Sequence, residues 1–146
     1  MKKPVSTVGR ATIGFVSGFL ATLLFHQFAL WLLKAAGMTD RGPWQMSPVP
    51  PFGIPSVISL AFWGGVWGVI LLFVLPRSAK AAYWVLAIVI GAIAPTLVAG
   101  LVVAPLKGIS VPADARGKML LLGLIVNGAW GLGTAVFGRL MLRNRN

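Results

Sequence analysis

Residues 56 to 75 read SVISLAFWGGVWGVILLFVL, a run that contains no Lys, Arg, Asp or Glu. A helix of this length covers about 30 Å, which is the thickness of the hydrocarbon layer of a membrane. Three further runs also lack these charged residues, and they extend over Ala11 to Leu33, Ala81 to Ala104 and Met119 to Gly138. Because a lipid-exposed segment must satisfy its own backbone hydrogen bonds, the four runs predict helices. We therefore expect an all-α, integral membrane four-helix bundle that forms one domain over residues 1 to 146.

The composition favours the same class and leaves little material for catalysis. Of the 146 residues, 58% are hydrophobic and only 10% are charged, which is far from the usual composition of soluble domains. Cysteine is absent, and Asp40 and Asp114 are the only carboxylates. A catalytic carboxylate pair within one site, a disulfide and a cysteine-rich metal cluster are thus excluded for a single chain. We expect no enzyme activity, no catalytic residues, no cofactor and no metal.

The positive charges indicate topology. The net charge is +11, but the Lys and Arg residues are scattered between the hydrophobic runs, so we expect no nucleic-acid partner. Eight of them belong to the two termini and the link after the second run, against five in the other two connections. The positive-inside rule then predicts that both termini face the cytoplasm. The first run is longer than the hydrophobic part of a signal peptide, so we expect it to be a retained span.

The connection over residues 34 to 55 reads KAAGMTDRGPWQMSPVPPFGIP and holds five of the ten prolines. Proline removes a backbone donor and restricts the preceding residue, so this segment cannot form a regular helix. Its apolar residues Trp44, Met46 and Phe52 suit the membrane surface or a cap over the mouth of the bundle. The segment is either a stiff connector or a lid for a substrate or partner.

Small residues four apart allow close approach of helices in a membrane. Each of the four runs carries such a stripe. The candidates for helix packing are Gly14, Gly18, Gly64, Gly68, Gly91, Gly123 and Gly131. These stripes hold one bundle together, form a face for a homodimer, or do both.

His26 is the one side chain within a run that ionises near neutral pH, and Gln27 follows it. Helix rise places His26 and Asn127 at nearly the same depth, so a hydrogen bond between them is feasible. We expect His26 to point into the bundle, within side-chain reach of the fourth run near Asn127. The candidate polar site comprises His26, Gln27, Asn127 and Thr22, the last being on the same stripe as His26. Three roles are open for this site. It is a hydrogen-bonded bridge between helices, a site that relays protons or binds a substrate, or a metal or haem site to which a second copy of the chain adds another His26.

Three stretches resemble a group of uncharacterised proteobacterial inner-membrane proteins of this size. They are FHQ at Phe25 to Gln27, AAGMTDRGPW at Ala35 to Trp44, and GIPSVISLAFWGGVWG at Gly53 to Gly68. The resemblance implies four spans and a bacterial inner membrane, and it carries no known activity or site residues.

Together these features predict a non-catalytic accessory, assembly or interaction protein of the inner membrane. Its expected partners are the lipid bilayer and either another protein or a second copy of the chain. The alternative is a homo-oligomeric channel or transporter for a small solute, with His26 and Asn127 along the path and the proline-rich loop over its mouth.

Overall fold

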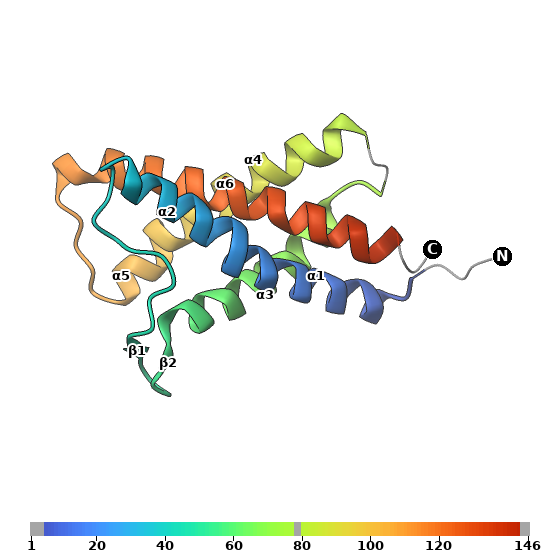
Figure 1. Ribbon diagram of the computed structural model, residues 1–146, viewed down its shortest axis with the longest axis horizontal. Helices are drawn as coiled ribbons and strands as arrows, with labels where there is room; N and C mark the ends of the chain where they lie inside the picture. Colours follow the sequence, from blue (N-terminus) through green and yellow to red (C-terminus); the bar gives the residue numbers. More distant parts are fainter. Residues whose placement is uncertain (1–4, 78–79, 144–146) are drawn as a thin grey trace.

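The computed structural model describes residues 5–77 and 80–143 (Figure 1). Four of its helical segments are long and apolar enough to cross a membrane, and they extend over Thr7–Ala35, Ser56–Val74, Ala81–Leu106 and Ala113–Arg143. The prediction of an all-α four-helix bundle is confirmed, and the chain is a membrane protein.

The first and third spans are not uniform α-helices, because each contains a π-helical turn. The first comprises α1 (Thr7–Ala21), the π-helical η1 (Thr22–His26) and α2 (Gln27–Ala35). The third comprises α4 (Ala81–Val98), the π-helical η2 (Ala99–Val103) and α5 (Ala104–Leu106). The second and fourth spans are the single helices α3 (Ser56–Val74) and α6 (Ala113–Arg143).

Successive spans run in opposite directions. One end of the bundle, the terminal end, holds the start of α1, the end of α6 and the link from α3 to α4 (Figure 1). The other end, the loop end, holds residues 36–55 and 107–112. Both of these connections therefore lie on one side of the membrane.

The fourth helix is longer than the sequence indicated, since it begins at Ala113 instead of Met119. Pro112 directly precedes it, a place where the missing N–H of proline has no cost, and the Ala115 N–H donates to the Pro112 carbonyl at 3.0 Å. Asp114 lies in the first turn, where a carboxylate favours the positive end of the helix dipole. The connection between the third and fourth spans is correspondingly short.

Residues 36–55 leave α2 through a turn in which Gly37 has a φ of +71°. They then form a small antiparallel hairpin of β1 (Pro48–Val49) and β2 (Ile54–Pro55), which leads directly into α3. These strands lie outside the four spans, in agreement with the expectation that no strand crosses the membrane.

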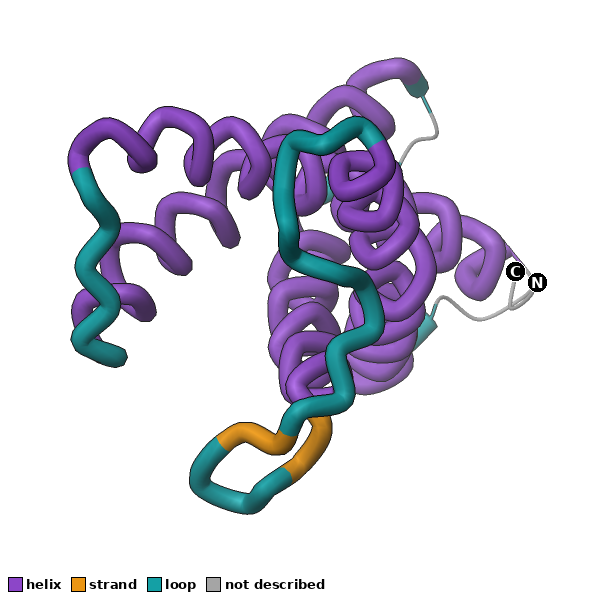
Figure 2. Tube along the Cα trace, turned by 60° about the vertical axis from the view of Figure 1, so that its left-hand side comes forward, coloured by secondary structure: helices purple, strands orange, loops and turns teal. Residues whose placement is uncertain are grey.

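The four spans pack as two helix pairs that are consecutive in the chain. We call α1 with α3 the first pair, and α4 with α6 the second pair. The pairs join mainly where α6 lies along α1, and α3 scarcely touches α4 (Figures 1 and 2). The shared core contains Ala21, Leu71, Leu75, Tyr83, Ala87, Trp130 and Ala135.

Polar side chains fix the terminal end. The Arg10 guanidinium donates to the Leu72 and Leu75 carbonyls, which are among the last carbonyls of α3 and have no further helical partner. The Tyr83 hydroxyl donates to the Ala135 carbonyl at 2.8 Å, which ties α4 to α6. Each helix pair thus has its own bond at this end.

Candidate functional site

The first pair crosses at glycines that leave no room for a side chain. A Cβ on Gly14 would lie 2.8 Å from Cα of Val69, and one on Gly68 would lie 2.8 Å from Cα of Gly18. A Cβ on Gly18 would overlap the carbonyl of Gly64. The two backbones are therefore in direct contact, an arrangement that only glycine permits.

The second pair crosses in the same way. A Cβ on Gly91 would lie 2.7 Å from Cα of Gly131, and a Cβ on Gly131 would overlap the Ala87 carbonyl. At Gly123 the obstacle is a side chain, because an added Cβ would lie 2.9 Å from Cγ2 of Thr96. All seven predicted packing glycines thus meet another span of the same chain, so these glycine faces serve the bundle itself.

The two crossings share the contacts of one glycine. Gly68 faces the carbonyl of Gly14 and Cα of Gly18, just as Gly131 faces the carbonyl of Ala87 and Cα of Gly91. The sequence around the two glycines repeats as well, since residues 65–68 read GVWG and residues 128–131 read GAWG. This repeat is a signal in the sequence that relates the second span to the fourth.

Trp130, the tryptophan of the second repeat, joins the pairs. Its indole is only 3% exposed and donates to the Gly18 carbonyl at 3.0 Å. The same carbonyl accepts the Thr22 hydroxyl at 2.9 Å. Gly18, which lies at the crossing of the first pair, therefore also binds Trp130 of the second pair through its carbonyl.

Asn127 lies inside the second pair, at the position where the first pair has Gly64. Its side-chain amide donates to the Thr96 hydroxyl at 2.8 Å, next to Pro95 within α4. This bond between side chains of neighbouring spans is a packing device common in membranes.

His26 and Gln27 belong to a different cluster, at the loop end. Nδ1 of His26 lies 3.3 Å from the Gln27 amide nitrogen, and Gln27 is only 3% exposed. The side-chain carbonyl oxygen of Gln27 accepts a hydrogen bond from the backbone N–H of Trp44 at 2.8 Å. The Trp44 indole donates to the Leu23 carbonyl at 2.9 Å, within the π-helical turn η1. We call these contacts of Gln27, Trp44 and Leu23 the loop anchor.

The expected hydrogen bond between His26 and Asn127 is corrected by these contacts, which give each side chain another partner. The expectation extended the stripe of Gly14, Gly18 and Thr22 by four residues to His26. A π-helical turn bonds i to i+5 and so holds more residues than an α-helical turn. Because η1 begins at Thr22, the spacing of four no longer keeps His26 on the stripe.

Two double-mutant cycles distinguish the observed contact between Asn127 and Thr96 from the expected contact between Asn127 and His26. We expect Thr96→Val and Asn127→Leu to show a coupling of about 0.6 kcal/mol, the usual size for a hydrogen bond between spans. His26→Gln and Asn127→Leu should be additive, because the two residues share no partner. Unfolding free energies in detergent micelles provide the measurement. Coupling in the second cycle and additivity in the first would support the original expectation.

The part of the chain that the structure describes holds no group of three or more His, Asp or Glu side chains placed to hold a metal ion. What the site offers is therefore a set of internal contacts: two glycine crossings, one bond between Asn127 and Thr96, and the loop anchor. Comparison with protein-family models, with curated proteins and with solved structures found no match to this chain.

Proposed function

We propose that this chain is a non-catalytic accessory, assembly or interaction protein of the bacterial inner membrane. It acts through its outer surfaces, with a protein partner or a second copy of itself, and its interior serves only to hold the four spans together.

One observation carries this proposal: the polar groups of the spans are already used within the chain. No buried side-chain nitrogen or oxygen of the described residues lacks a hydrogen-bond partner. Gln27 holds the loop, Asn127 holds α4, and the buried Thr22 and Thr134 hydroxyls bond to carbonyls of their own helices. A solute site built from Gln27, Asn127, Thr22 or Thr134 would have to break one of these contacts.

The transport alternative is less well supported. It requires His26 and Asn127 to line one path, but His26 lies beside the loop anchor of the first span and Asn127 lies inside the second pair. A tightly crossed pair of backbones at each glycine contact also leaves no width for a solute between α1 and α3, or between α4 and α6, so a path would have to lie outside these pairs.

For the orientation, we propose that the terminal end faces the cytoplasm. Arg10, Arg77, Lys80, Arg139 and Arg143 all lie near this end in the described part of the chain, and cytoplasmic connections are enriched in such residues. The loop end then faces away from the cytoplasm.

Photo-crosslinking in native membranes tests the proposed role. A photoreactive amino acid is placed at Trp63 in α3 or at Leu97 in α4, two exposed positions on different pairs. We expect a discrete product that contains another protein or a second copy of the chain. The same variants, purified at low concentration in detergent, serve as the control, because a weakly held partner is removed there. Lipid adducts alone at both positions would contradict the proposal, as would a solute flux in vesicles that His26→Gln abolishes.

A further inference from the structure

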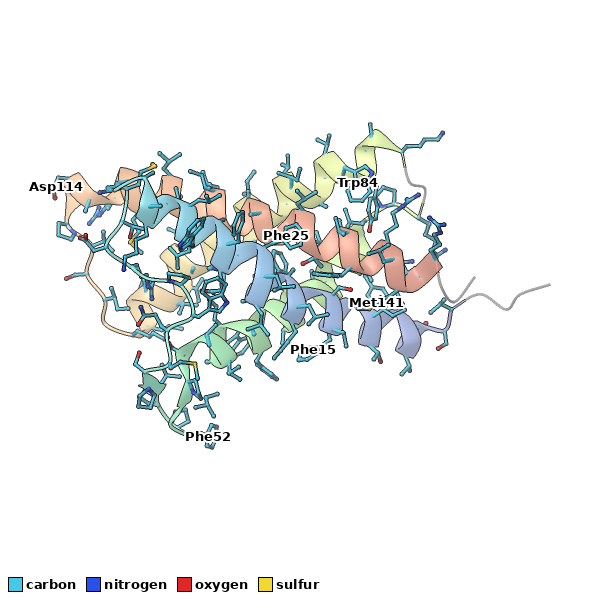
Figure 3. All side chains as sticks on the ribbon, viewed as in Figure 1. Phe15, Phe25, Phe52, Trp84, Asp114 and Met141 are labelled. Atoms are coloured by element: carbon cyan, nitrogen blue, oxygen red, sulfur yellow. The ribbon has the colours of Figure 1, made fainter. Side chains whose placement is uncertain are left out.

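The structure leaves one apolar element outside the four spans, which we call the apolar hairpin (residues 46–55). Phe52 at its tip is 84% exposed and Met46 is 65% exposed. Figure 3 shows Phe52 pointing away from the helices. In Figure 2 the hairpin strands extend beyond the bundle and do not cross its mouth. The hairpin is therefore not a cap over the bundle.

The hairpin is an ordered projection, because several bonds fasten it to the first turn of α3. The Ser56 N–H donates to the Ser47 carbonyl at 2.9 Å, and the Val57 N–H donates to the Gln45 carbonyl at 3.0 Å. The Ser56 hydroxyl donates to the same Gln45 carbonyl at 2.8 Å. On the other side, Trp44 is held by the loop anchor. Exposure of Phe52 is thus imposed by the fold.

The position of the hairpin identifies what covers it. It ends where the membrane span α3 begins, so it lies at the depth of the membrane interface. The span that the hairpin adjoins also exposes apolar side chains, among them Ile58, Phe62 and Trp63. Phe52 has an apolar ring, a type of side chain that interfacial segments insert into the boundary between headgroups and acyl chains.

The chemistry of the hairpin fits a lipid surface. Residues 42–56 contain no Lys, Arg, Asp or Glu, so no charge has to leave water. Four of the ten hairpin residues are prolines, which have no backbone N–H that would need a partner among acyl chains. The β1–β2 pairing satisfies further backbone groups.

We propose that the apolar hairpin is a membrane anchor: Phe52 and Met46 insert into the headgroup and upper acyl region of the leaflet at the loop end. The anchor fixes the depth and the tilt of the first and second spans, because it is joined to η1 and α2 through the loop anchor and to α3 through Ser56. This role is independent of any protein partner.

The absence of cysteine from the chain allows a direct test, because a single introduced thiol is the only one present. Phe52→Cys carries an environment-sensitive fluorophore, and the full chain is reconstituted in phosphatidylcholine vesicles with or without spin-labelled phosphatidylcholine. Met46→Cys is a second probe of the hairpin. Gly117→Cys is the matched control, since it lies at the same end of the bundle in the charged stretch DARGK and has open space around it.

The labels at positions 52 and 46 should show blue-shifted emission, quenching by the spin-labelled lipid and protection from aqueous iodide. The label at position 117 should show the reverse. Iodide quenching at both hairpin positions, with no effect of spin-labelled lipid, would overturn the proposal. Protection from iodide that requires a high protein-to-lipid ratio and occurs without lipid quenching would also overturn it, and would identify a second copy as the occupant.

Discussion

Gly18→Val should be among the most destabilising single substitutions in this protein. The new side chain would overlap the carbonyl of Gly64 and crowd Cα of Gly68, both of which are backbone atoms of a packed helix. The helices must therefore separate, and this separation also breaks the indole bond from Trp130 to the Gly18 carbonyl. We expect a loss of about 3 kcal/mol, the upper part of the range for overpacked cores. The measurement is the free energy of unfolding in detergent micelles.

Gly117→Val is the matched control, because this glycine lies in α6 with no atom within contact distance of an added Cβ. It should change stability by only a few tenths of a kcal/mol, since valine and glycine differ little in intrinsic helix propensity. Equal stability of the Gly18 and Gly117 variants would show that α1 and α3 do not cross at Gly18.

Trp130→Ala should cost about 3 to 5 kcal/mol, the range measured for truncating a buried aromatic residue to alanine. The indole is almost fully buried in the core shared by both pairs, and its N–H is bonded to α1. Trp130→Phe keeps most of the volume and loses the bond, so its expected cost is about 1 kcal/mol. The difference between the two variants separates packing from hydrogen bonding.

A substitution at Trp63 is the control for the two Trp130 variants. It has the same side chain in a span, but it is 58% exposed and faces away from the core. Trp63→Ala should therefore cost much less than Trp130→Ala under the same conditions. If the two losses are similar, the contact between α1 and α6 does not support the bundle as described.

Much of the fold follows from patterns within single spans. The absence of charge over some twenty residues is sufficient to predict each span, because the thickness of the membrane sets that length. The stripes of small residues were informative for a similar reason, since Gly18 and Gly91 need only the spacing of one helix to be identified. Helix ends were less predictable: Asp114, Arg116 and Lys118 are charged, yet they lie within α6 beyond its apolar part.

The arrangement of spans relative to one another required information that no single span carries. Helix rise gives the depth of His26 and Asn127, but not the neighbour that each side chain faces. The π-helical turn at Thr22–His26 changes the side of the helix on which His26 lies, and no residue pattern in the sequence predicts this turn. The loop anchor was also missed, because it depends on the Leu23 carbonyl, a backbone group. The repeat of GVWG and GAWG, in contrast, was visible in the sequence.

The pairing of consecutive spans has a consequence for the order of assembly. Each glycine crossing joins helices that are neighbours in the chain, so the first can form before the second pair has been synthesised. The bond from Trp130 to Gly18 joins residues 112 positions apart and has to wait for α6. Growth from the N-terminus therefore favours two helical hairpins that form in turn and then dock. The last step of this biogenesis is the closure of α6 onto a site already shaped by Gly18.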